Sequence, residues 1–284
     1  MVLAHLSAHP PALEPGFWEL LRQGWFREPW AVAGILATAL IYFGLRRGTW
    51  DRHSLHFSLG CGVLFLALAS PIAAIAEDYL FSVHMLQHLL LEVVAVPLLL
   101  IGIPKSGARR LLRYPWLRKV AGILGDPIVA WTIGVGMMWI WHWPALFNWT
   151  LESRAAHAFE HFCFIAAATV FWNAVLDPIE SFRLKPFAAV AYLFSACAAH
   201  TLLAVLITFA PPGLYPKYSQ LGDPLGLGAM LRQRWGLDPA TDQQLGGAFL
   251  WMMGCFIFIL FILAVLARYY RQPERDLPLE GSRP

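Results

Sequence analysis

The chain alternates long apolar stretches with short polar connections, and seven of the stretches are about as long as a membrane-spanning helix. A bilayer core about 30 Å thick is crossed by roughly 20 helical residues, with a range of about 17–25. The predicted spans are approximately Trp30–Leu45, Leu55–Ile75, Val83–Ile103, Pro127–Trp143, His157–Leu176, Phe187–Ala210 and Leu245–Ala267. We therefore predict an all-α integral membrane bundle of seven transmembrane helices.

Basic residues are distributed unevenly among the connections. Of the 21 Lys and Arg residues, 15 fall in residues 46–53, 104–126, 177–186 and 268–284, and 6 fall in the other connections. Because basic loops stay in the cytoplasm, this distribution predicts an outer (periplasmic) N-terminus and a cytoplasmic C-terminus. We expect a periplasmic N-terminal tail at 1–28, a transmembrane domain at 29–267 and a cytoplasmic tail at 268–284.

The longest connection, residues 211–244, falls on the outer side and is rich in Pro and Gly. A loop of this length is usually functional or flexible, so it could cap the outer face of the bundle. No soluble domain or internal repeat is evident, and the N-terminus lacks the basic start and apolar core of a cleavable signal peptide. The chain is therefore expected to form one membrane domain.

Composition agrees with this pattern. Hydrophobic residues make up 58% of the chain and charged residues 14%, against about 45–50% and about 25% in soluble proteins. This excludes a cytosolic enzyme, a secreted disulfide scaffold and a disordered tail. The net charge of +3 is too small to indicate a nucleic-acid partner. The four cysteines lie singly in apolar stretches, which argues against a disulfide framework or a zinc knuckle.

Histidine is the unusual residue type, with ten in a chain of low charge. Two of them, His53 and His56, lie at the predicted cytoplasmic start of the second span. Two residues four positions apart on a helix lie on the same face, separated by about 6 Å along the helix axis. Two histidines with this spacing could therefore share one ion. Both His84/His88 and His157/His161 have this spacing. The histidines predicted in the membrane or on its outer side are His84, His88, His142, His157, His161 and His200.

Other polar and sulfur-containing residues extend this pattern. Glu92 lies four residues beyond His88, at a depth comparable to that of His200, and ionisable groups inside a span usually have a partner or a function. Imidazole suits copper, zinc, iron and nickel, and thioether sulfur adds a preference for Cu(I). The candidate auxiliary or second-shell residues are Met85, Glu92, Glu160, Glu77, Asp78 and Met252. The residues thus predict a transition-metal site near the outer surface.

Structural interpretations of single residues stay open. His142, between Trp141 and Trp143, is typical of an interfacial belt, and methionines in a bundle usually serve packing. Hydrolase, zinc-protease and phosphate-loop motifs are missing, and Ser82 near His84 has no orienting third group. We therefore expect no enzymatic activity. The basic connection at residues 104–126 is expected to contact anionic membrane lipid.

Two short patterns stand out, HMxQH within residues 81–91 and DQQLGG at residues 242–247, together with residues 141–144, 157–161 and 200. In order and spacing, these segments resemble the polytopic CtaG family of caa3-type cytochrome c oxidase assembly factors. The similarity covers roughly residues 50–267. The resemblance implies a bacterial inner-membrane protein that helps to mature a haem-copper oxidase and delivers or inserts copper. The expected partners are oxidase subunits, membrane lipid and a periplasmic copper donor.

Four functions fit these observations. In the leading hypothesis, Cu(I) or Cu(II) enters from the periplasmic face, is held by several outer histidines and passes to an oxidase subunit. The alternatives are a redox protein with a b-type haem between two histidines, an ion or metal transporter using the level of Glu92 and His200, and a structural partner without metal. The first hypothesis requires the histidine pairs of the third and fifth spans to face each other.

Overall fold

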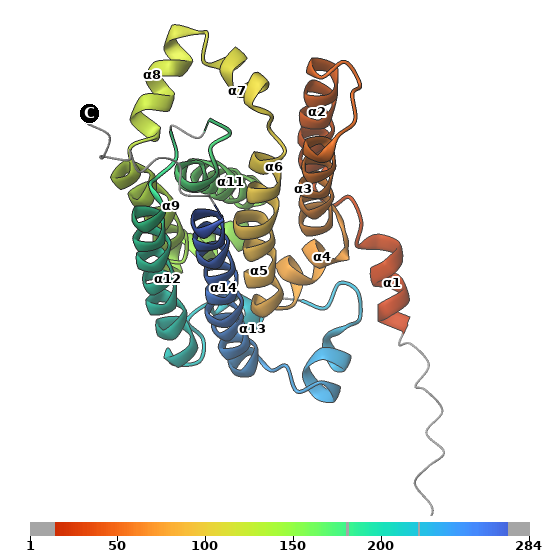
Figure 1. Ribbon diagram of the computed structural model, residues 1–284. Helices are drawn as coiled ribbons and strands as arrows, with labels where there is room; N and C mark the ends of the chain where they lie inside the picture. Colours follow the sequence, from red (N-terminus) through yellow and green to blue (C-terminus); the bar gives the residue numbers. More distant parts are fainter. Residues whose placement is uncertain (1–14, 180–181, 221, 272–284) are drawn as a thin grey trace, which may run out of the picture.

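The computed structural model describes residues 15–179, 182–220 and 222–271, and within these ranges the chain is all-α with no strand. The helices pack side by side in a bundle, joined by short helices at both ends (Figure 1). The first half comprises α1 (Pro15–Gln23), α2 (Pro29–Leu45), α3 (Arg52–Ala69), α4 (Pro71–Asp78), α5 (Phe81–Leu89), η1 (Leu90–Ala95), α6 (Val96–Ile101) and α7 (Lys105–Leu111). The second half comprises α8 (Pro115–Leu124), α9 (Pro127–Trp141), α10 (Pro144–Glu152), α11 (Arg154–Leu176), α12 (Pro186–Phe209), α13 (Lys217–Gln220), η3 (Ala229–Arg234) and α14 (Pro239–Tyr270).

Five helices among the described residues are long and apolar enough to cross a membrane: α3, the continuous segment from α5 to α6, α11, α12 and α14. The pair α8 and α9 would make a sixth as one broken span, with a bend of 72°. Helix α2 is apolar but shorter, at 17 residues. The chain is thus a multi-pass membrane protein, and the count of seven spans stays a prediction.

One predicted span is divided in two. The stretch expected as a single helix over residues 55–75 ends at Ala69, and a separate helix, α4, begins at Pro71. Proline is favoured at the first helical position because its missing N–H needs no partner there. The Ser70 side chain accepts a hydrogen bond from the backbone N–H of Ile72 at 3.2 Å and so caps the new helix. Residues 71–78 therefore belong to one end of the bundle.

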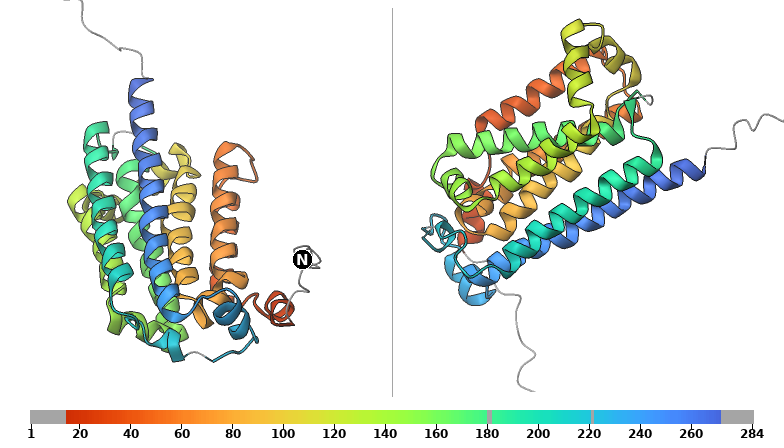
Figure 2. Two further views of the ribbon diagram at one scale, coloured as in Figure 1. Left: turned by 90° about the horizontal axis from the view of Figure 1, so that it is seen from below. Right: turned by 90° about the vertical axis from the view of Figure 1, so that its left-hand side faces the viewer.

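The two ends of the bundle differ in chemistry. Helices α7 and α8 and the C-terminus of α14 lie at one end, which we call the basic end (Figure 1). Helices α1, α4 and α13 lie at the other, which we call the histidine end. Helices α12 and α14 run side by side for most of their length (Figure 2), and α14 also packs against α5. The described parts of the connection between α12 and α14, including α13, lie at the histidine end (Figure 1), and Tyr215 and Tyr218 are buried there.

Candidate metal centre

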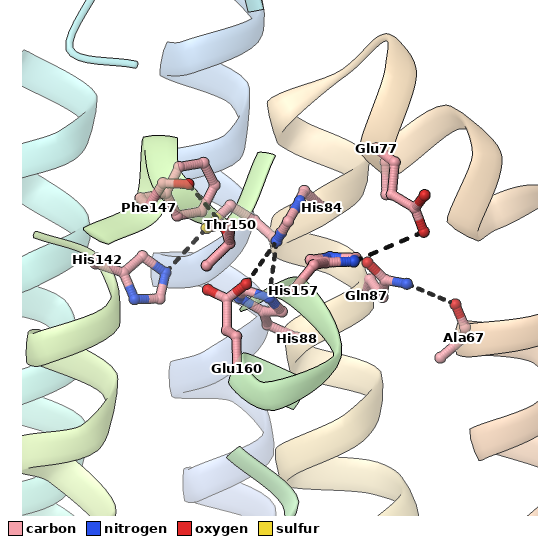
Figure 3. A network of polar contacts seen from close by, with 12 residues as sticks. Ala67, Glu77, His84, Gln87, His88, His142, Phe147, Thr150, His157 and Glu160 are labelled. Carbon is pink, nitrogen blue, oxygen red and sulfur yellow. Dashed lines mark hydrogen bonds and ion pairs between the residues drawn. The ribbon is translucent and has the colours of Figure 1, made fainter. Parts of the chain in front are cut away.

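Helix α5 presents two histidines on one buried face. His84 and His88 are 0% and 1% exposed, and their Nε2 atoms lie 2.9 Å apart. Two nitrogens that bind one ion at about 2.0–2.1 Å lie roughly 3 Å apart when their bonds are near a right angle. Figure 3 shows the two side chains pointing toward the same point inside the bundle. The pair therefore has a spacing that suits a shared ion.

Helix α11 faces this pair with its own two histidines. The ring centroids of His157 and His161 are 4.1 Å apart, and the distances to the facing rings are 5.3 Å for His84–His157 and 5.6 Å for His88–His161. We call these four residues the histidine cluster. The expectation that the two i,i+4 pairs face each other within bridging reach is confirmed.

Three carboxylates surround the cluster. Glu160 is fully buried, with Oε2 4.0 Å from His84 Nε2. Glu28 and Glu77 approach the Nδ1 atom of His157 at 3.2 and 3.8 Å. Burial raises the pKa of the Glu77 carboxyl above its ordinary value, and the nearby His157 opposes that shift. The cluster is therefore polar, enclosed and bordered by carboxyl groups.

A tyrosine from α13 fixes the orientation of His84. The Tyr218 hydroxyl donates to the carbonyl of Ala76 at 2.8 Å and lies 3.0 Å from His84 Nδ1. Burial raises the pKa of Tyr218 well above its ordinary value, so the hydroxyl stays protonated. Because its one proton is given to Ala76, it accepts from His84 Nδ1–H. The Nε2 lone pair of His84 is then directed into the cluster.

Several buried polar atoms of the histidine cluster and of Glu160 have no hydrogen-bond partner among the described residues. A buried polar atom without a partner costs about 1–3 kcal/mol, and a native fold rarely keeps many of them together. The unpartnered atoms here are His88 Nδ1, His157 Nε2, both ring nitrogens of His161 and both carboxylate oxygens of Glu160. A bound cation would satisfy nitrogen lone pairs and carboxylate oxygens at once. The donor set therefore fits a metal ion.

The possible ligands form three overlapping groups, in each of which the ligand atoms lie within 4.8 Å of one another. The groups are His84 with His88 and His161, Glu28 with His157 and His161, and His84 with His157 and Glu160. Each cluster histidine except His88 belongs to two groups. An ion bound by one of these groups would therefore use some of the same ligands as an ion bound by the next group.

His142 and Met85 border the cluster without entering these groups. His142 follows α9, its Nδ1 lies 2.7 Å from the Met138 carbonyl, and its Nε2 lies 3.3 Å from the Met85 sulfur. The His142 ring centroid is 5.7 Å from that of His88. Both residues are almost fully buried. They form a thioether–imidazole pair next to the histidine cluster.

His200 and Glu92 lie apart from the cluster. Both line a separate cavity of about 10 Å³, next to Trp172 and Phe258, which is room for about one water molecule. His200 Nδ1 lies 2.9 Å from the Ala196 carbonyl. The expected common depth of these two residues agrees with their shared cavity, but His200 does not join the other five histidines that were predicted with it. Glu92 belongs to η1, a wider π-helical turn, and such turns often occur at functional positions.

Two predicted auxiliary residues lie elsewhere. The Met252 side chain is 69% exposed on α14, because its face of that helix is turned outward from the bundle. Asp78 forms an ion pair with Arg27 instead of supporting a histidine. Both residues were predicted to lie near the histidines because of their position in the sequence or their depth in the membrane. Neither property determines the helix face on which a side chain lies.

The structure adds residues that the sequence pattern did not single out. Glu28 precedes the first apolar helix by one residue, and its contact with His157 spans 129 positions of the chain. Tyr218 lies in the loop that was expected to cap the outer face. Gln87, inside the HMxQH pattern, donates from Nε2 to the Ala67 carbonyl at 2.8 Å. Gln87 therefore ties α5 to α3, and only the histidines of this pattern face the cluster.

The DQQLGG segment holds α5 in place. Asp242 accepts hydrogen bonds from the backbone N–H groups of Phe81 at 2.7 Å and Ser82 at 3.0 Å, which are free at the start of that helix. Gln243 donates to the carbonyls of Ala210 and Pro211 and so binds the end of α12. The segment is part of α14 and thus connects this helix to the start of α5 and the end of α12. The contact with α5 at Ser82 lies two residues before His84.

Comparisons with known proteins find distant relatives of this chain. An uncharacterized protein of Mycobacterium leprae is 24% identical over 233 residues, which cover 76% of this chain and 34% of that protein. An uncharacterized protein of Mycobacterium bovis is 25% identical over a segment of the same length and coverage. The chain thus spans about a third of the length of these relatives. No solved structure matches it significantly.

The family match covers most of the chain. The family model described as cytochrome c oxidase caa3 assembly factor (Caa3_CtaG) matches residues 36–272. This range includes all four histidines of the cluster, the His142–Met85 pair and the segment that caps α5. It does not include Glu28, which contacts His157 and precedes the matched range. The chain belongs to the family of cytochrome c oxidase caa3 assembly factors.

Proposed function

We propose that this assembly factor binds a copper ion at the histidine cluster and passes it to a subunit of a haem-copper oxidase. The observation that carries the proposal is the convergence of four histidine rings from α5 and α11 on one buried point beside Glu160, with several of their nitrogens lacking a protein partner. Copper is cargo in this scheme, and the chain performs no catalytic step. The expected partners are the oxidase subunit that receives the ion, the surrounding lipid and a periplasmic copper donor.

The donor chemistry favours copper among the metals that imidazole accepts. Neutral imidazole binds zinc, copper, iron and nickel, and a thioether shifts the preference toward Cu(I). The Met85 sulfur lies beside His142 at the edge of the cluster. Cu(II) is accommodated by the histidines together with Glu160. One site can therefore hold either oxidation state with different subsets of ligands.

Delivery requires ligands that exchange easily. The three donor groups share His84, His157 and His161, so an ion can move between groups by replacing one ligand at a time. Glu28 and Glu77 lie next to His157 and provide negative charge for an arriving cation. We propose that copper reaches His157 first and then moves to His84 and His88.

The proposed setting is the bacterial inner membrane, with seven spans, an outer N-terminus and a cytoplasmic C-terminus. Support comes from the 15 basic residues in the connections on one side against 6 on the other. In this orientation the histidine end faces the periplasm. A periplasmic donor could then reach Glu28 and Glu77 without crossing the bilayer.

A haem between two of the histidines is a weaker candidate. The histidine rings pack against one another and against Phe147 and Phe164, with His84–Phe147 centroids 5.0 Å apart and His88–Phe164 centroids 4.5 Å apart. Direct ring contacts leave no slot for a macrocycle between opposed ligands. A Soret band in the purified protein would favour haem and contradict simple copper delivery.

Metal analysis of the purified full-length chain tests the proposal. After loading with Cu(I) and removal of free metal, we expect close to one copper per chain, and nearly none in the His84→Ala/His88→Ala variant. The matched control is His53→Ala/His56→Ala, which removes two histidines from the basic end. Copper retained by the first variant, or lost equally from both, would refute the assignment of the site.

A further inference from the structure

The basic end of the bundle contains a large cavity that the histidine cluster does not use. Its volume is about 870 Å³. The walls come from the ends of α6 and α11, the start of α3 and the last turn of α14. This cavity lies at the opposite end of α5–α6 from His84, so it is separate from the proposed copper site.

The cavity collects positive charge from all four basic segments of the chain. A single acidic residue among the described lining, Asp51, is paired with Arg46 at 2.7 Å. The cationic lining residues are Arg46, Arg52, Lys105, Arg183 and Arg268. Residues that lie far apart in sequence thus place five basic side chains around one space, and the lining contributes one carboxylate, that of Asp51. Such an arrangement is unfavourable unless an anion balances it.

Several of these cations keep donors available. Among the described residues, the guanidinium groups of Arg52 and Arg268 have no ion pair, and Nε of Arg46 is buried without a hydrogen-bond partner. The fork of N–H donors on arginine matches the oxygens of a phosphate group. The charge and the donor geometry both favour a phosphate-bearing ligand.

The remaining lining shows which phosphate compound fits. Leu100, Ile101 and Leu176 form an apolar wall that continues into the membrane-spanning parts of α6 and α11. A free phosphate ion would fill only a small part of the volume and would leave this wall without a partner. A phospholipid supplies both parts, because its head group carries the phosphate and its acyl chains are apolar.

We propose that this cavity binds the head group of an anionic phospholipid from the adjacent leaflet. The positive-inside distribution places that leaflet on the cytoplasmic side. Basic pockets between transmembrane helices on this side commonly hold anionic head groups. The bound lipid places its phosphate among the basic side chains of the lining and joins the ends of α3, α6, α11 and α14.

Lipid titration of the purified full-length chain tests the proposal. In neutral detergent, we expect native mass spectrometry to detect bound phosphatidylglycerol and little phosphatidylcholine with the same acyl chains. The Arg52→Gln/Arg268→Gln variant should bind phosphatidylglycerol roughly 30-fold more weakly, because each basic residue near an anionic surface adds about 1 kcal/mol. The control, Arg47→Gln/Arg271→Gln, removes two exposed charges at the same end that do not line the cavity.

Three results would overturn the proposal. Equal weakening in both variants would indicate non-specific attraction, and equal binding of phosphatidylcholine would remove the role of charge. A third arm uses inorganic phosphate at constant ionic strength. If it prevents phosphatidylglycerol binding and stabilises the protein against heating as much as the lipid does, the site binds free phosphate. Retained copper binding in the Arg52→Gln/Arg268→Gln variant shows that the bundle is still folded.

Discussion

At the scale of single residues, the histidines of the cluster differ in how they are held. His84 has its Nδ1 proton directed to Tyr218, and His157 has Nδ1 next to Glu28. In both rings, therefore, one nitrogen is oriented by a neighbour and Nε2 is left for an ion, which is the usual arrangement of metal-binding histidines. Both nitrogens of His161 have no protein partner among the described residues. We therefore expect His161 to reorient most when metal binds.

Glu160 provides a test at this scale. Its carboxylate is fully buried beside His84 and has no hydrogen-bond partner among the described residues. Glu160→Gln keeps the size of the side chain and removes the charge that would balance a cation. We expect copper affinity to fall about 10–100-fold, as measured by competition with a Cu(I) chelator.

The control for this change is Glu152→Gln, at an exposed position near the end of α10. It should leave copper affinity unchanged. If Glu160→Gln also binds copper as tightly as the parent chain, Glu160 contributes neither a ligand nor charge compensation. The two histidine pairs would then have to hold the ion without it.

At the scale of helices, close approach of α14 to α5 determines where the first histidine pair lies. Gly246 packs directly on Phe81, and a Cβ atom added there would lie 2.3 Å from Cδ1 of that ring. Phe81 is 2% exposed, and the added Cβ would also meet Met85 at 3.3 Å, so the ring has little space into which to move. The glycine therefore allows the contact that places Asp242 at the start of α5.

Gly246→Ala tests this packing. We expect the variant to lose about 1–3 kcal/mol of stability, which is typical of overpacking in a dense core. Thermal unfolding in detergent measures the loss, and copper content should also fall because His84 moves with α5. The control is Gly34→Ala in α2, where an added Cβ meets nothing within 4 Å. Equal stability of the two variants would contradict the proposed role of Gly246.

The sequence predicted helices and their spacing better than contacts between distant segments. Apolar length located α5–α6, α11, α12 and α14, and the i,i+4 spacing correctly placed each histidine pair on one helix face. The break at Pro71 was obscured because the apolar pattern continues through it. Glu28 and Tyr218 could not be assigned to the cluster, since loop and tail positions have no periodicity that shows where they fold.

At the scale of the whole molecule, two chemically different sites occupy opposite ends of one bundle. The histidine end combines imidazoles and carboxylates, and the basic end gathers arginines around a cavity. Between them, large apolar side chains such as Leu40, Phe194 and Phe256 are more than half exposed, as expected for a surface that contacts lipid. The proposed functions of both ends depend on the orientation of the bundle in the membrane.

Cysteine labelling tests that orientation. In a background with Cys61, Cys163, Cys197 and Cys255 changed to Ala, Ser219→Cys and Ser106→Cys introduce one exposed thiol at the histidine end and one at the basic end. In intact spheroplasts, we expect a membrane-impermeant maleimide to label the thiol at 219, and the thiol at 106 only after permeabilisation. The reverse pattern would place the basic end outside, against the distribution of Lys and Arg. Labelling of both from outside would require an even number of crossings between these positions, whereas the proposed topology has three.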